Sequence, residues 1–485
     1  MDDHDERMEA DTVALDDLKL LIESIKYRQE DLEFQEQALK TMASIFRTSD
    51  NTSSFLVHTN GLEHILKILI SPDDQPNSLR EASLHALCAA CENNAGARQV
   101  LCTQKIFCVL KKFLLMKSSI RLQTLSSYLL ICLIKNNEKG QNLARQTKCV
   151  ETLRYLFKDV RSPSHSPRLP NRLGEYLSSN CQENEALMNL WQTATHALSV
   201  CVYNPQNNDN QFLCSSAFPA AVAYLRNSDY PRIQTSTLTF LTNCLVNNSR
   251  CQVNFRLVGG IRVLYDIFRE DLLAGGQIPS TVLQILILTI DAAVRDNDMC
   301  RDSIAEMEIV PLLLQSLQLC FASPKFKIQC LITLSACIEG CDSSCKQFLT
   351  NDGMLTVVKV LTENQNCEEL QKSALCVLQT YLEQTKITIP ECMDDVLKKI
   401  QIAPDNFLRV ENGKQNIEGE GEVDVTNVEN GSSNGCESNV IENRDIMPSG
   451  QTDMIVNRIQ DLTNEVRSFK ELCVFTAVRR VLQLT

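Results

Sequence analysis

The sequence predicts an all-α protein built as a right-handed α-solenoid, a row of stacked helical repeats. Only 16 glycines and 14 prolines occur among 485 residues, too few turn formers for the many chain reversals of an all-β fold. A single hydrophobic core stops growing at about 250–300 residues, so a chain of this length should form several domains or stack repeats. An apolar pattern that recurs at a nearly constant step favours repeats.

The pattern is an apolar stripe of the form Φ-x-x-Φ-Φ-x-x-Φ, in which Φ is an apolar residue and x is any residue. This spacing puts the apolar side chains on one face of a helix. Successive stripes begin 44, 44, 68, 43, 49 and 44 residues apart, and the long step contains a proline-rich inserted loop at 158–178. The stripes are Leu62–Leu69, Ile106–Phe113, Val150–Leu156, Phe218–Leu225, Ile261–Phe268, Val310–Leu317 and Met354–Leu361.

A second amphipathic stretch precedes each polar, mostly asparagine-containing turn and completes the repeat. Its strong helix formers and apolar spacing near 3.6 residues predict another helix. Two or three helices in a unit of about 40–47 residues are typical of armadillo and HEAT solenoids. One unit cannot bury both faces of its helices, so neighbours stack and leave a concave groove. These stretches are Leu79–Cys91, Leu122–Ile134, Leu187–Val202, Ile233–Val246, Val282–Val294 and Ile328–Ile338.

The repeats run through residues 18–385, about seven to eight units in all, and the flanking segments differ in composition. Residues 1–17 carry eight acidic side chains and one arginine, and we expect them to form a disordered acidic tail. Helices at Leu18–Ile25 and Leu32–Phe46 should cap one end of the solenoid, and residues 386–410 the other.

The carboxy-terminal part is expected to leave the solenoid. Residues 411–453 contain ten acidic and two basic side chains and no aromatic one, which predicts a disordered acidic linker. Apolar residues at steps near 3.5 in residues 454–482 predict an amphipathic helix or a short coiled coil.

Export and membrane insertion are not expected. The acidic amino terminus does not fit a secretory signal, which needs a basic start and an apolar run. The most apolar stretch, Ile278–Ile290, is too short to cross a bilayer. We therefore expect a soluble protein whose 22 cysteines stay reduced and serve as small apolar core residues.

Neither catalysis nor a bound cofactor is expected. Six histidines give little material for a convergent site, and His85 and His196 fall in the middle of repeat helices. Cys88 and Cys91 lie three residues apart on one apolar helix face, and no second pair follows at zinc-finger spacing. The Cys337, Cys341 and Cys345 series likewise has no matching pair. We expect no metal site, while a zinc protein or a cysteine-dependent enzyme stays open as an alternative.

Charge is the most informative local signal. Residues 105–172 hold fourteen basic and three acidic side chains, a net charge of +11 in a chain whose total is −13. Because these bases belong to two adjacent units, they should form one patch suited to an acidic peptide or a phosphate backbone, or else a solvated outer face. We expect charge reversal at Lys111, Lys112, Arg145 and Lys148 to weaken a partner contact without changing thermal stability. The candidate partner-binding residues are Lys111, Lys112, Lys117, Arg121, Lys135, Lys139, Arg145, Lys148, Arg154 and Lys158.

The inserted loop offers two candidate phosphorylation sites, Ser162 and Ser166, each followed by a proline. Phosphates there would partly neutralise the basic patch beside them. A plain proline-kinked loop is the alternative.

The order of helix, asparagine pair, glutamine and G-Φ-x-x-L resembles the armadillo repeat, as in TFLTNCLVNNSRCQVNFRLVGGIRVLYDIF from Thr239 to Phe268. Armadillo transport receptors hold signal peptides with columns of asparagine and tryptophan in the groove. Only Asn243 fits these columns here, so we do not expect carriage of nuclear signals. The asparagine column reads Ala89, Cys132, Val200, Asn243, Ala292 and Ala336, and the tryptophan column reads His85, Tyr128, His196, Thr239, Leu288 and Ile332.

Three longer segments resemble the armadillo region of the telomere repeats-binding bouquet formation family: Asn136–Phe157, Val200–Pro219 with its NPQN string, and Leu361–Leu378. The resemblance implies a nuclear meiotic scaffold that links telomeres to the inner nuclear membrane for homologue pairing. Its implied partners are a shelterin telomere-repeat factor, other bouquet-formation proteins, a SUN-domain envelope protein and cohesin. The family ends in a Myb-like domain, and nothing after Asp453 fits it, so we do not expect direct DNA binding. A general armadillo adaptor of another pathway is the alternative function.

Overall fold

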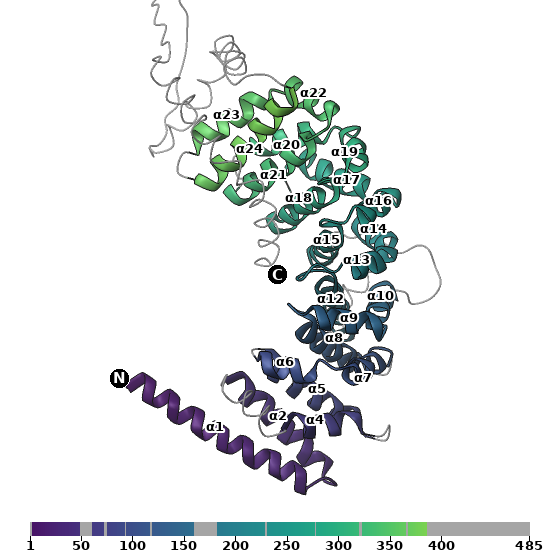
Figure 1. Ribbon diagram of the computed structural model, residues 1–485, viewed down its shortest axis with the longest axis vertical. Helices are drawn as coiled ribbons and strands as arrows, with labels where there is room; N and C mark the ends of the chain where they lie inside the picture. The colour runs from purple at the N-terminus through teal and green to yellow at the C-terminus, as the bar shows by residue number, and fades with distance from the viewer. Residues whose placement is uncertain are drawn as a thin grey trace, which may run out of the picture. The chain divides into compact units, whose positions relative to one another are not determined.

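Every regular element in the part of the chain that the structure describes is a helix (Figure 1). The computed structural model describes residues 2–48, 61–71, 75–92, 94–116, 119–159, 182–227, 230–276, 278–319, 323–364 and 367–385. These residues divide into two compact units, the first ending at Leu312 and the second beginning at Leu313.

The first unit is built from three-helix repeats that follow a capping pair, α1 (Asp2–Tyr27) and α2 (Leu32–Thr48). Each full repeat has a short first helix, a middle helix and a longer third helix. The first helices are α6 (Ala95–Leu101), α9 (Glu138–Gln146), α13 (Asn208–Cys214), α16 (Ser249–Leu257) and α19 (Asp298–Ala305). The middle helices are α4 (Gly61–Ile70), α7 (Gln104–Leu114), α10 (Cys149–Asp159), α14 (Phe218–Asn227) and α17 (Gly260–Leu273). The third helices are α5 (Asn77–Glu92), α8 (Ile120–Ile134), α12 (Gln182–Val202), α15 (Pro231–Leu245) and α18 (Ser280–Val294).

The third helices form the spine of this unit. Helix α2 packs on α5, α5 on α8, α8 on α12, α12 on α15 and α15 on α18. Each middle helix covers the third helix of its own repeat, as α7 covers α8 and α10 covers α12. Because both sides of a third helix are covered, its residues are buried almost all round, as in α18, where twelve of fifteen residues are buried.

A cluster of four aromatic side chains fixes the junction of α10, α12, α14 and α15. The Phe157 ring lies 5.7 Å from the Trp191 ring, 5.3 Å from the Tyr224 ring and 5.2 Å from the Phe240 ring. Trp191 Nε1 and the Tyr224 hydroxyl both donate to the Phe157 carbonyl oxygen, at 3.1 and 2.8 Å. This carbonyl lies in the last turn of α10, where helix carbonyls lack partners within the helix, so the two side chains cap the end of α10.

The second unit continues the helical pattern with α20 (Ile309–Leu317), which spans the division, α21 (Pro324–Ile338), α22 (Asp342–Thr350), α23 (Gly353–Glu363) and α24 (Glu368–Thr385). Helix α24 packs on both α21 and α23. The Ser335 and Thr380 hydroxyls meet at 2.8 Å, and the Phe348 and Tyr381 rings lie 5.0 Å apart.

The predicted all-α armadillo-like solenoid is confirmed, and each predicted stripe and amphipathic stretch lies within a helix or overlaps one. The expected disordered tail at residues 1–17 is wrong, because α1 begins at Asp2. No glycine or proline occurs before residue 61, and acidic residues are favourable near a helix amino terminus. Leu18, Ile22 and Ile25 are buried at helical spacing in α1, which packs on α2 and α4, so the helix is held at its carboxy-terminal half.

The inserted loop begins later than expected, because Lys158 and Asp159 still belong to α10. Its remaining residues, with Ser162 and Ser166, lie outside the described residues, as do the segments 386–410, 411–453 and 454–482. None of the described helices combines the length and the apolar character needed to span a bilayer.

Candidate functional site: the repeat junctions and the basic repeats

The asparagine turns give two separate roles to neighbouring residues. The first residue is left-handed, with φ of 56° at Asn136, 50° at Asn247 and 56° at Asp296, a conformation that asparagine and aspartate tolerate. The next residue is an asparagine that caps the following short helix, because its Oδ1 accepts from the backbone N–H three residues on. These caps are Asn137, Asn248 and Asn297, and Asn94 and Asn207 cap α6 and α13 in the same way.

In α9, α13 and α16 a buried glutamine then joins the short helix to the next repeat. Gln211 Nε2 of α13 donates to the carbonyl oxygens of Asn243 at 2.9 Å and Val246 at 3.1 Å, at the end of α15. Its Oε1 accepts from Nδ2 of Asn248 at 2.9 Å. One side chain therefore satisfies the end of the third helix of its own repeat and the cap of the first helix of the following repeat.

The same arrangement recurs at two further junctions. Gln252 Nε2 donates to the carbonyls of Ala292 and Arg295, at 2.8 and 3.0 Å, and its Oε1 accepts from Asn297 at 2.9 Å. Gln141 donates to the carbonyls of Val200 and Pro205, at 3.0 and 2.9 Å. We call the three glutamines and their cap asparagines the glutamine ladder: Gln141 with Asn207, Gln211 with Asn248, and Gln252 with Asn297.

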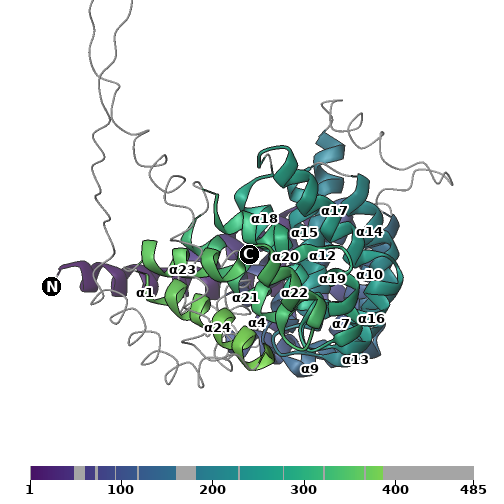
Figure 2. The ribbon, with the colours of Figure 1, turned by 90° about the horizontal axis from the view of Figure 1, so that it is seen from above.

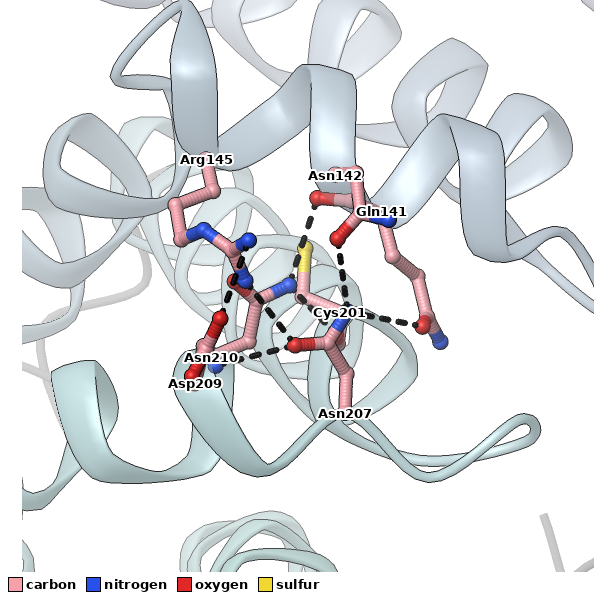
Figure 3. Close-up of polar contacts among 7 residues, drawn as sticks. All are labelled: Gln141, Asn142, Arg145, Cys201, Asn207, Asp209 and Asn210. Atoms are coloured by element: carbon pink, nitrogen blue, oxygen red, sulfur yellow. Dashed lines mark hydrogen bonds and ion pairs between the residues drawn. The ribbon is translucent and has the colours of Figure 1, made fainter.

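Arg145 belongs to the first of these junctions (Figure 3). Its Nη1 donates to Oδ1 of Asn207 at 3.1 Å and of Asn210 at 3.3 Å, and its Nη2 lies 3.1 Å from Oδ2 of Asp209. Asn210 Nδ2 in turn donates to the carbonyl oxygens of Gln141 and Cys201, at 3.2 and 2.9 Å. Because its guanidinium joins α9 to α13, we now expect reversal of Arg145 to lower stability, unlike reversal of an exposed lysine.

Two more of the ten predicted residues also make contacts inside the chain. Arg121 Nε lies 3.5 Å from Oε2 of Glu81, and Arg154 Nη1 donates to the Leu213 carbonyl at 2.6 Å. Lys117 lies outside the described residues. The remaining lysines lie at two places: Lys135 and Lys139 at the turn between α8 and α9, and Lys111, Lys112, Lys148 and Lys158 on or next to α7 and α10.

The turn between α8 and α9 places two exposed lysines beside the row of third helices. Lys135 follows the last residue of α8, and Lys139 lies in the first turn of α9. Burial first, and then the positive charge of Lys135, lower the pKa of His196 on α12. Glu138, which is also exposed, lies between the two lysines in sequence.

Polar side chains on α2, α5 and α8 form a network one repeat earlier. Arg47 Nη2 lies 3.0 Å from Nε2 of His85, and the Tyr128 hydroxyl donates to Oε1 of Glu92 at 3.2 Å. Burial and then Arg47 lower the pKa of His85, and burial with the Glu92 charge raises the pKa of Tyr128 to about 12. A neutral His85 can accept from Arg47, and a protonated Tyr128 can donate to Glu92, so both groups serve the packing of these helices.

The cysteines have the environment of core residues. All those described are buried except Cys108, which is exposed, and Cys367, which is partly exposed. Burial raises the pKa of Cys132 and of Cys149 to about 11, which disfavours the thiolate that nucleophiles and metal ligands need. Among the described residues, no group of three or more histidine, cysteine and acidic side chains could hold a metal ion.

Sequence comparison finds similarity to proteins named telomere repeats-binding bouquet formation protein 1, which confirms the resemblance seen in the three quoted segments. The human protein is 33% identical over 366 residues, which is 75% of this chain and 48% of that protein. The mouse and zebrafish proteins are 30% and 28% identical over 368 residues, 46% and 43% of their lengths. The chain thus spans about half the length of the curated relatives it matches. No family model matches the chain.

Comparison with solved structures supports the fold alone. A crystal structure of an engineered protein has a TM-score of 0.61 at 17% identity and covers 80% of this chain and 85% of its own. A structure reported for a phosphorylation switch in the interaction between cadherin and β-catenin has a TM-score of 0.52 at 13% identity, over 79% of this chain and 62% of its own.

Proposed function

We propose that this chain, whose repeat region is similar to telomere repeats-binding bouquet formation protein 1, is a non-catalytic scaffold of meiotic chromosome ends. It would link telomeres to the inner nuclear membrane during homologue pairing and chromosome movement. The observation that carries the proposal is the extent of the similarity, 366 residues that make up three quarters of the chain.

The structure supports a scaffold rather than a catalyst. The glutamine ladder uses buried side chains to fix the position of one repeat on the next, and fixed repeats present their surface residues in a constant arrangement. Buried thiols such as Cys132 and Cys149 take part in packing, and burial raises their pKa values and so disfavours the thiolate.

The implied partners are those of a telomere scaffold: a shelterin telomere-repeat factor, other bouquet-formation proteins, a SUN-domain envelope protein and cohesin. We propose Lys135 and Lys139 as contacts for an acidic segment of one of these partners, because both are exposed and both adjoin the third-helix row. Phosphorylation of Ser162 and Ser166 would add negative charge near the basic repeats and would weaken such a contact.

The test is the position of the tagged full chain in meiotic prophase nuclei. We expect foci that coincide with telomeres at the nuclear periphery, and a K135E/K139E variant should show fewer of them. A control variant with the same charge change, K325E/K346E, reverses two exposed lysines of the second unit and should keep the wild-type pattern. Diffuse or cytoplasmic signal for the wild-type chain would contradict the proposal and favour an armadillo adaptor of another pathway.

A further inference from the structure

Helix α1 presents an acidic face with apolar residues to solvent. Leu18, Ile22 and Ile25 are buried against the body of the unit. On the opposite face of the helix, Val13 is 58% exposed and Leu20 is 63% exposed. Asp17 and Glu23 are exposed beside Leu20, three residues away on either side, so they share its face of the helix. Residues 1–17 together carry a net charge of −7.

The middle helices α7 and α10 present a surface of the opposite character. Lys105 is exposed in the first turn of α7, and Leu115, which caps the carboxy-terminal end of this helix, is 53% exposed. Tyr155 and Lys158 lie three residues apart on one face of α10, and the exposed Lys148 lies in the turn directly before this helix. Tyr155 is 47% exposed. We call these five residues the outer face. Helices α7 and α10 contact each other and pack on α8 and α12 through their other sides, so their exposed sides point outward together.

The acidic part of α1 cannot reach the outer face of its own chain. Both views of this unit show the amino end of α1 on the side opposite to α7 and α10 (Figures 1 and 2). The helix is held there by its buried carboxy-terminal half. A second copy of the chain meets no such restriction.

We infer that the outer face binds the acidic face of α1 from a second copy of this chain. The carboxylates of Asp17 and Glu23 would approach the lysines, and Val13 and Leu20 would pack against Tyr155 and Leu115. Aromatic residues surrounded by charges are typical anchors of protein interfaces. Since two different surfaces meet, the contact is of the head-to-tail kind, which forms a closed ring or an open chain of copies.

The test is sedimentation of the purified full chain over a range of concentrations at low, physiological and high salt. We expect reversible self-association that weakens as salt rises, because exposed charges are screened within about 10 Å at 0.1 M salt. A chain that stays monomeric at every concentration in low salt overturns the inference.

Two charge-reversal variants make the test specific. In K105E/K158E an acidic outer face meets an acidic α1, and in D17K/E23K a basic α1 meets a basic outer face. Each variant alone should associate at least about tenfold more weakly than the wild-type chain, the size expected from the loss of two to four exposed charge pairs. A 1:1 mixture should associate again, because each variant then supplies the surface that complements the other.

The control K325E/K346E has the same charge change as K105E/K158E and should associate like the wild-type chain. Unchanged thermal unfolding of each variant, followed by circular dichroism, ensures that a loss of association is not a loss of fold. Failure of the mixture to associate, or equal association of all variants, overturns the inference. Binding of an added polyglutamate peptide by chains that do not self-associate also overturns it, and indicates that the outer face serves a separate acidic partner. Lys135 and Lys139 are unchanged throughout, so neither result depends on the telomere proposal.

Discussion

Replacing Gln211 by alanine should destabilise the first unit more than any surface change. The side chain is fully buried, and the substitution removes two donated hydrogen bonds, to Asn243 and Val246, and one accepted from Asn248. A net hydrogen bond contributes about 0.5–1.5 kcal/mol, and a buried group left without a partner costs about 1–3 kcal/mol. The Asn248 amide and the Asn243 carbonyl lose these partners together, so we expect a loss of about 3–4 kcal/mol in the free energy of unfolding.

The assay is urea unfolding of the full chain followed by circular dichroism, together with amide hydrogen exchange. Exchange should speed up most at the end of α15 and the start of α16, the two elements that Gln211 joins. The control is Gln146→Ala, the same substitution at an exposed position in the last turn of α9, which should change stability by less than about 0.5 kcal/mol. If Gln211→Ala costs no more than this control, the glutamine ladder does not stabilise the repeats and the reasoning is refuted.

Three further outcomes follow from the junctions and the thiols. Arg145→Ala should lower the free energy of unfolding by about 1–3 kcal/mol, because it removes the guanidinium that donates to Asn207 and Asn210. The control Lys148→Ala, on an exposed turn, should lower it by less than about 0.5 kcal/mol. Equal values for the two variants would contradict the assigned role of Arg145. Asn248→Ala should cost about 2 kcal/mol or more, because a helix cap worth about 1 kcal/mol and a ladder contact are lost together. Urea unfolding would show whether this cost exceeds that of Asn94→Ala, which removes the cap of α6, a helix outside the glutamine ladder. Burial raises the pKa of Cys132 and Cys149 to about 11, so at pH 8 only about one thiol in a thousand is ionised at either position. Mass spectrometry should therefore find the exposed Cys108 alkylated before these two cysteines; labelling of all three at one rate would mean that these helices open easily.

The sequence predicted the long helices because their information is local. A stripe such as Ile106–Phe113 or the stretch Ile328–Ile338 shows its apolar face within one window. The short first helices, such as α13 with seven residues, are too short to show such a stripe. The part of α1 before Leu18 was missed because its acidic composition resembles a disordered tail, whereas the buried residues that hold the helix lie beyond that part.

The candidate site could be predicted only in part, because charge is visible in a sequence and pairing is not. The ten bases were expected to form one patch, but the contacts of Arg145 depend on how α9 stacks on α13, across a separation of 62 residues from Asn207. The glutamine after each asparagine pair was noted as part of the armadillo pattern. Its function as a bond between repeats depends on the stacking register, which no single repeat contains.

The aromatic cluster around Phe157 gives the protein an optical reporter of its own. Trp191 is the only tryptophan of the chain, and it is fully buried, stacked on Phe157 and hydrogen-bonded to the end of α10. Its fluorescence therefore reports on one place, the packing of α10, α12 and α14. Emission that shifts to longer wavelength as the indole meets water would time the opening of that junction without any added label, while circular dichroism follows the helices of the whole chain.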